Sequence, residues 1–182
     1  MRIVVVGCSG AGKTTLAGRL ARGLKTPCIE VDAINWQPNW WSLAVNDPEQ
    51  FREGVIAAIH PEHWVLDGNY SAVRDYVWRR ATHLIWLDYS RWVVMSRVIR
   101  RSMIRIAFRV KLYSGNQELW RNLLSSSHPI RSAWNMWDKR RRDIAEHLGR
   151  DEFAHIVVLH LRHPSEVSEA MKHLSDGAGD QV

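Results

Sequence analysis

Residues 7–15 of the chain read GCSGAGKTT, and this stretch decides the fold. The fixed places of the pattern G-x-x-x-x-G-K-[ST] are filled by Gly7, Gly12, Lys13 and Thr14. A match of this kind arises by chance in roughly 1% of chains of this length. The pattern therefore predicts a loop that binds the phosphates of a nucleoside triphosphate, with an ordinary glycine-rich turn as the alternative.

The sequence on each side of the loop supports this prediction. The β-branched run 2–6 leads directly into the loop, as a buried parallel strand does. After the loop, Leu16, Leu20 and Leu24 recur at helical spacing and share one face. A strand, a glycine-rich loop and a helix in this order place backbone N–H groups where phosphate oxygens bind.

The residue types in the loop indicate its ligands. The charge of Lys13 suits the β- and γ-phosphates, and the hydroxyl of Thr14 is placed to ligate Mg²⁺. We therefore expect ATP and Mg²⁺ as cofactors. The residues expected at the nucleotide are Gly7, Cys8, Ser9, Gly10, Ala11, Gly12, Lys13, Thr14 and Thr15.

The composition excludes several other classes of protein. The 182 residues are 46% hydrophobic and 24% charged, as in one globular domain, which we expect to span residues 1–182. No signal peptide is visible, and no apolar run approaches the length of a membrane span. Cys8 and Cys28 make no disulfide framework. We therefore expect a cytoplasmic protein with no membrane partner.

Positive charge is concentrated in one third of the chain. The formal net charge is +6. Residues 91–142 contain 13 Lys and Arg against Glu118 and Asp138, so this segment carries +11 and the remainder carries −5. Such a segment implies a phosphate-rich partner, either a nucleotide or a nucleic acid.

Five strand-like runs alternate with helical patterns. They occupy residues 2–6, 28–31, 64–66, 83–87 and 156–161. This alternation predicts an α/β fold, the three-layer sandwich of P-loop NTPases, with a five-stranded parallel sheet and helices on both faces. The stretch between Ser90 and His155 is too long for a simple connector, so we expect a helical lid there, inserted at about residues 100–142.

Three stretches together resemble the adenylate kinase-like branch of P-loop kinases. The first is the loop itself. The second is Leu66-Asp67-Gly68, which resembles the Leu-Asp-Gly of their third strand, whose Asp lies beside the Mg²⁺ site. The third is Leu87-Asp88-Tyr89-Ser90, which leads towards Arg97 and Arg101, like the strand and helix before their lid. The resemblance implies an ATP-dependent kinase in which Asp67 and Thr14 hold the metal.

The resemblance also implies roles for individual arginines. Arg97 corresponds to the one that packs on the adenine ring, and Arg101 to the one that reaches the transferring phosphate. Arg131 and Arg142 have the spacing of two further arginines beyond the lid. Together with the loop lysine and Asp32, the expected catalytic set is Lys13, Asp32, Arg101, Arg131 and Arg142.

Two acidic residues after expected strands have alternative interpretations. Small-metabolite P-loop kinases, such as those for gluconate and shikimate, resemble this chain in having an acid where Asp32 ends the second strand. There the acid orients or deprotonates the acceptor hydroxyl, or holds Mg²⁺ through water. The alternative for Asp32 is a turn or helix cap. For Asp88 a helix follows at once, and we expect capping.

The acceptor half of the sequence departs from the adenylate kinases. Those enzymes place an arginine soon after Asp-Gly to hold the acceptor phosphate, but here the next arginine is Arg74. Residues 33–63 hold only Arg52, together with tryptophans that either stack on an acceptor or close a small secondary core, namely Trp36, Trp40 and Trp41. The sequence therefore does not match a nucleoside monophosphate kinase.

Two functions from different classes remain. The first is a phosphotransferase that moves the γ-phosphate of ATP·Mg²⁺ to an unidentified small-molecule acceptor, a nucleotide or a hydroxyl metabolite. The alternative is a nucleic-acid-binding P-loop protein with a regulatory or weakly hydrolytic ATP site, in which the basic segment 91–142 contacts DNA or RNA. The Gly68-Asn69-Tyr70 pattern and the arginine-rich second half are similar to small bacterial DNA topology modulation proteins. The histidines show no metal-ligand spacing, so we expect no zinc site.

Overall fold

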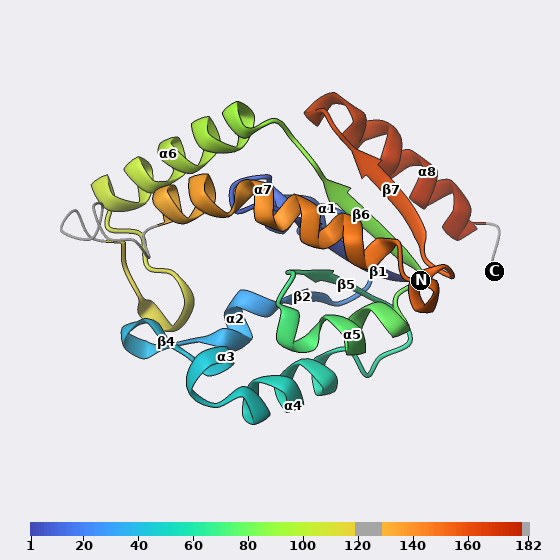
Figure 1. Ribbon diagram of the computed structural model, residues 1–182, viewed down its shortest axis with the longest axis horizontal. Helices are drawn as coiled ribbons and strands as arrows, with labels where there is room; N and C mark the ends of the chain where they lie inside the picture. The colour runs from blue at the N-terminus through green and yellow to red at the C-terminus, as the bar shows by residue number, and fades with distance from the viewer. Residues whose placement is uncertain (119–128, 180–182) are drawn as a thin grey trace.

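The computed structural model describes residues 1–118 and 129–179, and a five-stranded parallel sheet forms its centre (Figure 1). The strands follow the order β2-β5-β1-β6-β7 across the sheet. Their bounds are β1 Arg2–Gly7, β2 Cys28–Glu30, β5 Trp64–Asp67, β6 His83–Leu87 and β7 Val157–Leu161. The α/β class and all five expected strands are thus confirmed.

The register of the sheet brings the candidate site residues to one edge. β1 is central, and its residues Ile3 to Val6 have no solvent exposure. Val5 lies opposite Asp67 of β5, and Gly7 lies opposite Leu87 of β6. Because all strands are parallel, the loop after β1 and the residues that end β5 and β6 meet at the same carboxyl edge.

Helices cover both faces of the sheet (Figure 1). One core packs α1, α6 and α8 against Ile3, Val5 and Ile85, and the other packs α4 and α5 against Val4 and Leu66. α7 contributes to both cores. The bounds of the helices are α1 Lys13–Gly23, α2 Val31–Asn35, α3 Leu43–Asn46, α4 Pro48–Ala58, α5 Ser71–Arg80, α6 Arg91–Ala107, α7 Pro129–Leu148 and α8 Val167–Gly179.

The second strand is shorter than the sequence suggests. Only Cys28, Ile29 and Glu30 pair with β5, so Asp32 does not end the strand but lies in the short helix α2. The chain can turn here because Gly68 lets Val31 approach: Gly68 has φ 150°, and a Cβ on it would lie 2.8 Å from Val31 Cβ. Asp32 therefore lies in the first helical turn of α2, directly after the end of β2.

A small hairpin and the segment after α6 form a second local unit. The strands β3 Trp36–Gln37 and β4 Trp41–Ser42 pair in an antiparallel hairpin. α6 ends at Ala107, and the chain then runs down to this hairpin (Figure 1). The expected lid at about 100–142 includes residues 119–128, which lie outside the described residues. Within the described ranges, no helix is both long and apolar enough to cross a lipid bilayer.

Candidate active site

The loop after β1 is held against two helices. Gly10 has φ 88°, and a Cβ on it would lie 2.2 Å from Val98 Cγ2, so only glycine lets the loop lie directly on α6. The N–H of Ala11 donates to the Cys8 carbonyl at 3.1 Å, which closes a tight turn. α1 begins at Lys13, so the loop ends at a helix N-terminus that favours anions.

Lys13, Thr14 and Asp67 come together at the end of this loop. Lys13 Nζ lies 3.9 Å from Asp67 Oδ1, and the Thr14 hydroxyl donates to Asp67 Oδ2. The Asp67 side chain is only 6% exposed. Burial raises its pKa, although the Lys13 charge and the Thr14 hydrogen bond act in the opposite direction. A nearby cation stabilises the ionised form of a carboxylate whose pKa burial has raised.

The donor set at this point fits a magnesium ion bound to phosphates. Hydroxyl and carboxylate oxygens are the ligands that Mg²⁺ prefers, and Mg²⁺ usually takes only one or two of them from the protein. Thr14 is exposed and in contact with Asp67. In the described part of the chain, no group of three or more His, Cys, Asp or Glu could hold a metal ion by itself. Such an ion would therefore depend on ligand phosphates and water.

Two arginines of α6 reach the loop. Arg97 Nη1 donates to the Ala11 carbonyl at 2.9 Å, and its guanidinium lies 5.3 Å from the centre of the Tyr89 ring. Arg101 Nη2 donates to Ser9 Oγ at 3.3 Å. Burial lowers the pKa of Arg101, and its Nε atom is buried with no hydrogen-bond partner. Arg101 thus has an unsatisfied donor next to the loop, where phosphate oxygens would bind.

The charge of a different α7 arginine from those expected acts on the loop. Arg131 and Arg142 are both exposed. Burial raises the pKa of Cys8 and of Tyr70, and the charge of Arg140 opposes both rises. Arg140 lies three residues after Trp137 and four residues before Ile144, so the three side chains share one helix face. This spacing was a signal in the sequence that distinguished Arg140 from Arg131 and Arg142.

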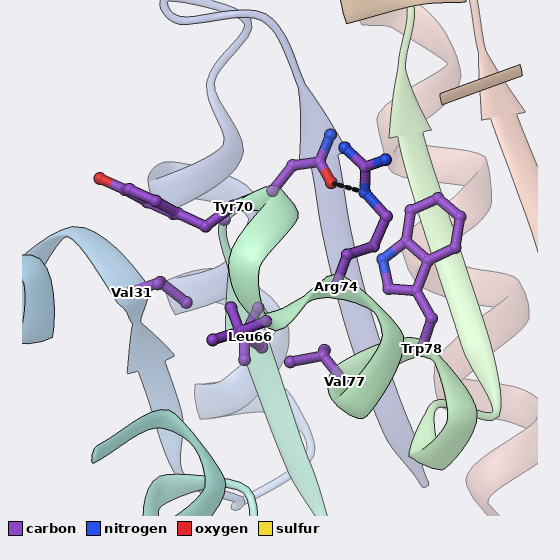
Figure 2. A pocket seen from close by; sticks show the side chains of 9 residues that line it. Val31, Leu66, Tyr70, Arg74, Val77 and Trp78 are labelled. Carbon is purple, nitrogen blue, oxygen red and sulfur yellow. Dashed lines mark hydrogen bonds between the residues drawn. The ribbon is translucent and has the colours of Figure 1, made fainter. Parts of the chain in front are cut away.

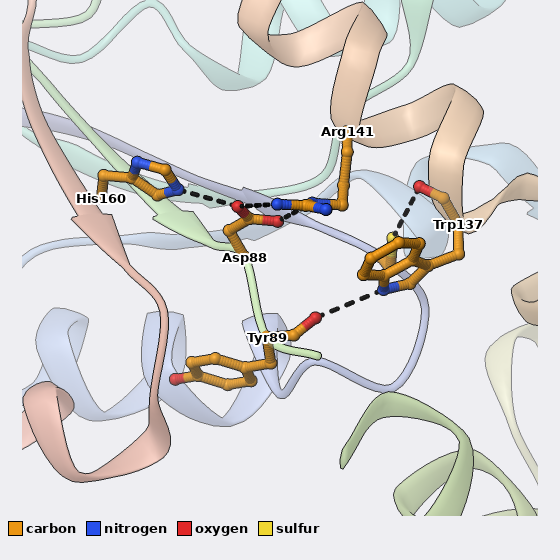
Figure 3. A network of polar contacts seen from close by, with 6 residues as sticks. Asp88, Tyr89, Trp137, Arg141 and His160 are labelled. Carbon is orange, nitrogen blue, oxygen red and sulfur yellow. Dashed lines mark hydrogen bonds and ion pairs between the residues drawn. The ribbon is translucent and has the colours of Figure 1, made fainter. Parts of the chain in front are cut away.

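Asp88 does not cap α6, and that prediction was wrong. Its side chain is 1% exposed and is paired with Arg141 of α7, whose Nη2 donates to Asp88 Oδ2 at 2.8 Å (Figure 3). His160 Nε2 of β7 lies 2.9 Å from the same oxygen. Ser90 stands at the N-cap position, with no side-chain capping bond. Asp88 is buried and its partners lie 53 and 72 residues away, so a local pattern could not show them.

Further contacts hold α7 on the loop. The Trp137 carbonyl lies 3.8 Å from Cys8 Sγ, which donates to it, and Trp137 Nε1 donates to the Tyr89 carbonyl at 3.3 Å (Figure 3). α7 is therefore attached to the loop through Trp137 and to the sheet edge through Arg141. This attachment fixes the helix that presents Arg140.

Arg74 is a buried structural residue rather than an acceptor ligand. Its Nε donates to Asn69 Oδ1 at 3.0 Å, and both of its terminal nitrogens donate to Asp143 of α7. Its guanidinium also lies 5.6 Å from the Trp78 ring centre. Figure 2 shows it pointing away from Tyr70, and the cavity that both residues line has a volume of only about 10 Å³. That volume suits one water molecule and no larger ligand.

Replacing Asp143 with alanine should destabilise the protein by about 3 kcal/mol, because it leaves the Arg74 charge buried and uncompensated. Burial alone would raise the pKa of Asp143, but Arg74 lowers it overall. The contribution is therefore present above the usual pKa of aspartate and lost as the pH falls through the lower folded value. Urea unfolding at neutral pH measures it.

The matched control for this prediction is Arg79→Ala. Arg79 pairs with Glu152 at 2.6 Å, but its side chain is 65% exposed. An exposed pair contributes less than about 1 kcal/mol. Equal losses in the two variants would contradict the structural role of the pair formed by Arg74 and Asp143.

Asp32 belongs to a hydrogen-bonded group on the opposite side of the loop. The Tyr70 hydroxyl donates to Asp32 Oδ1 at 2.5 Å, and Asn35 Nδ2 donates to the Tyr70 oxygen at 3.3 Å. Asn35 is buried, and its Oδ1 accepts from Ser42 Oγ and the Ala44 N–H. Burial and the Asp32 charge raise the pKa of Tyr70, which keeps the phenol protonated. Asp32 is thus held by a neutral donor.

The segment 112–118 is bound to the hairpin, and we call these two pieces the clasp. Asn116 Oδ1 accepts from the Trp40 N–H at 2.9 Å, and Asn116 Nδ2 donates to the Gln37 carbonyl at 2.9 Å. Ser114 Oγ donates to the Trp36 carbonyl at 2.7 Å. The Trp36 and Trp40 rings meet edge to face at 5.4 Å, whereas Trp41 is 44% exposed. Two of the three tryptophans therefore build the clasp.

Comparison with known proteins supports the class of fold. No protein-family model matches the chain, and no curated protein matches it. A shikimate kinase from Acinetobacter baumannii in complex with shikimate is similar over 99% of this chain and 94% of that chain, with a TM-score of 0.58 and 17% identity. A shikimate kinase from Aquifex aeolicus is similar over 100% and 99%, with a TM-score of 0.54 and 17% identity.

A third solved structure leads to the same conclusion. A gluconokinase from Sinorhizobium meliloti is similar over 98% of this chain and 95% of that chain, with a TM-score of 0.52 and 17% identity. At these identities the likeness shows the fold alone. The chain therefore shares the α/β fold of these solved P-loop kinases. The resemblance to DNA topology modulation proteins is not shown and stays a hypothesis.

Proposed function

We propose that this protein is a kinase that transfers the γ-phosphate of ATP·Mg²⁺ to a hydroxyl group of a small molecule. The observation that carries the proposal is the meeting of Lys13, Thr14 and Asp67 at the end of a glycine-rich loop. Arg101 reaches the same loop with a buried donor that has no partner. Phosphoryl transfer depends on such positioning and charge neutralisation more than on covalent chemistry.

Each residue then has a stated role. Lys13 and the loop N–H groups bind the donor phosphates, and Thr14 and Asp67 hold Mg²⁺, which neutralises the phosphate charge. The acceptor oxygen attacks the γ-phosphorus, the bond to the β-phosphate breaks, and ADP leaves. Asp32 orients the acceptor hydroxyl and takes its proton. Arg101 stabilises the charge of the transition state.

The arginines of α7 differ in their exposure to solvent. We propose that Arg140 acts beside Arg101 at the transferred phosphate, since its charge reaches Cys8 of the loop. Arg131 and Arg142 are exposed, so a catalytic role for them requires α7 or the lid to move. Arg97 is proposed for the adenine ring, because it is bonded to the end of the loop.

The alternative, a nucleic-acid-binding protein, is less well supported. Four arginines of α6 have partners inside the protein: Arg91 bonds Asp138, Arg97 and Arg101 bond the loop, and Arg105 bonds Glu118. Much of the basic charge is thus used within the fold instead of facing a polyanion. We place the kinase in the cytoplasm, where its two free cysteines stay reduced.

An acceptor screen tests the proposal. Purified protein with ATP and Mg²⁺ is offered nucleosides, nucleotides, sugars and other hydroxyl metabolites, and ADP release is measured. We expect release that depends on one class of acceptor and is lost when Mg²⁺ is removed by a chelator. Release that no acceptor increases, together with tight DNA or RNA binding, would favour the alternative.

Replacing Asp67 with asparagine should abolish Mg²⁺-dependent transfer without destabilising the ligand-free protein. The pKa of Asp67 is raised by burial, so the folded state favours its neutral form and its ionised form costs stability at neutral pH. Asparagine imitates the neutral form. We therefore expect an equal or higher melting temperature, and a smaller stabilisation by ATP·Mg²⁺ than in the wild type.

Asp75→Asn is the control, since Asp75 is exposed on α5. It should change neither the melting temperature nor the response to ATP·Mg²⁺. A clear fall in the melting temperature of ligand-free Asp67→Asn would assign this carboxylate a structural role instead.

A further inference from the structure

The cations of the proposed site lie on the side of the ATP phosphates. Lys13 pairs with Asp67 at the start of α1, and Arg101 bonds Ser9. Arg97 donates a hydrogen bond to the Ala11 carbonyl, and the charge of Arg140 opposes the rise in the pKa of Cys8. Ser9, Ala11 and Cys8 all belong to the loop. A tetra-anionic nucleotide explains these four positive charges without any charge on the acceptor.

The arginines on the acceptor side of the chain are engaged elsewhere. Arg74 stands nearest to the place where adenylate kinases hold an acceptor phosphate, but its three nitrogens bond Asn69 and Asp143. Arg52 pairs with Glu49 on α4. Arg105 pairs with Glu118, whose side chain is 4% exposed, at 2.8 Å. Each of these three cations has a partner that holds it in place.

Among the described residues, acidic and phenolic side chains gather beside the carboxyl ends of β2 and β5. We call this set the acceptor face; it comprises Glu30, Asp32, Tyr70 and Tyr113. The Tyr113 hydroxyl donates to Glu30 Oε2 at 3.0 Å, as the Tyr70 hydroxyl does to Asp32. Burial raises the pKa of Tyr113, and the charges of Asp32 and Glu30 raise it further, so the two hydrogen-bonded pairs are coupled electrostatically.

This face carries two carboxylates and two neutral phenols. Arg101 is near it, because the charge of Asp32 acts on the Arg101 guanidinium, yet the hydrogen bond of Arg101 goes to the loop. The charge of Arg140 opposes the rise in pKa of Tyr70 on this face and of Cys8 in the loop. An anionic acceptor would bring a third negative charge next to Glu30 and Asp32, in addition to the nucleotide. Like charges at such short range are strongly unfavourable.

We infer that the acceptor is a hydroxyl compound without an anionic group, whose reacting hydroxyl meets Asp32 and whose amine or second hydroxyl meets Glu30. This inference rests on the proposed kinase function. Each carboxylate oxygen has room for more than one hydrogen bond, so Glu30 can bind an acceptor while it still accepts from Tyr113. An ammonium group would gain more than a hydroxyl, because charge-assisted hydrogen bonds are stronger.

The test compares acceptors that share a carbon skeleton and differ in charge. Glucosamine, glucose and glucuronate form one set, and adenosine with its monophosphate forms another. Acceptor-dependent ADP release gives kcat/KM for each compound. Melting temperatures with Mg²⁺ and a non-hydrolysable ATP analogue measure binding. In any set that supports turnover, we expect the amine or neutral member to exceed the anionic one by at least about tenfold.

A variant identifies the residue responsible. Glu30→Gln should lower kcat/KM for the amine-bearing acceptor about tenfold and change that for its neutral counterpart much less. Stabilisation by the ATP analogue should not change. The control is Glu53→Gln, which removes the same charge from an exposed position on α4 and should affect neither acceptor.

The outcomes separate this inference from the proposed function. Preference for glucuronate or for the monophosphate would overturn the inference and leave the kinase proposal standing. An equal loss for amine-bearing and neutral acceptors in Glu30→Gln would overturn the role of Glu30. Absence of turnover and of stabilisation with every compound, while ATP·Mg²⁺ still binds, would overturn the proposed function and the inference with it.

Discussion

Replacing Lys13 with alanine should lower acceptor-dependent ADP release by about 10³-fold, because the variant lacks the charge that faces the donor phosphates. The Lys13 side chain is 17% exposed beside Asp67 and belongs to neither hydrophobic core, so the fold should persist. The loss should appear in turnover and in the thermal stabilisation given by ATP·Mg²⁺. Steady-state assays and melting curves on the same preparation measure both effects.

The control for Lys13 is Arg19→Ala on the same helix. Arg19 is exposed, and its removal changes the net charge equally without touching the loop. Its turnover should stay within about twofold of the wild type, since exposed substitutions are usually close to neutral. Unchanged turnover and nucleotide stabilisation in Lys13→Ala would rule out the nucleotide loop as the donor site.

The second large effect is expected for Arg101→Ala, which should lower kcat by about 10²-fold. Its guanidinium reaches Ser9 and keeps a buried donor without a partner, so its contribution should be greatest when charge develops on the transferred phosphate. KM for ATP should change much less than kcat, since an interaction made mainly in the transition state affects the rate and not the ground state.

Arg100→Ala provides the matched comparison for Arg101. Arg100 is the adjacent residue of α6 and is exposed. It should keep nearly full turnover if α6 serves a closed site. If both variants instead keep turnover and lose DNA or RNA affinity equally, with the salt slope reduced by about one each, α6 is a polyanion surface.

Much of the fold could be predicted because its signals are local. The loop pattern located the first strand and helix, and short strand-like runs between helical patterns located the other strands of the sheet. The ends of elements were less accurate: β2 ends at Glu30, whereas the expected strand continued to residue 31. Asp32 was assigned to a strand end because the turn at Val31 depends on its contact with Gly68, which the local pattern does not show.

The site was predictable where residues are close in sequence and less so where they are not. Thr14 and Asp67, which the family resemblance assigned to one metal site, lie in contact because the loop after β1 and the end of β5 meet at one edge of the sheet. Asp88 was misassigned because its partners belong to α7 and β7. Arg140 was overlooked because family spacing directed attention to Arg131 and Arg142, whereas the burial of the neighbouring helix face favours Arg140.

The clasp has a consequence for how such a protein diversifies. Its two pieces, the hairpin and segment 112–118, are about 75 residues apart in the chain but share hydrogen bonds through Asn116 and Ser114. Neither piece contributes to the nucleotide loop. A change of sequence in one piece therefore affects contacts made by the other, whereas the loop makes none of these hydrogen bonds. We expect a chimera that exchanges both segments together to be more stable than one that exchanges only one of them.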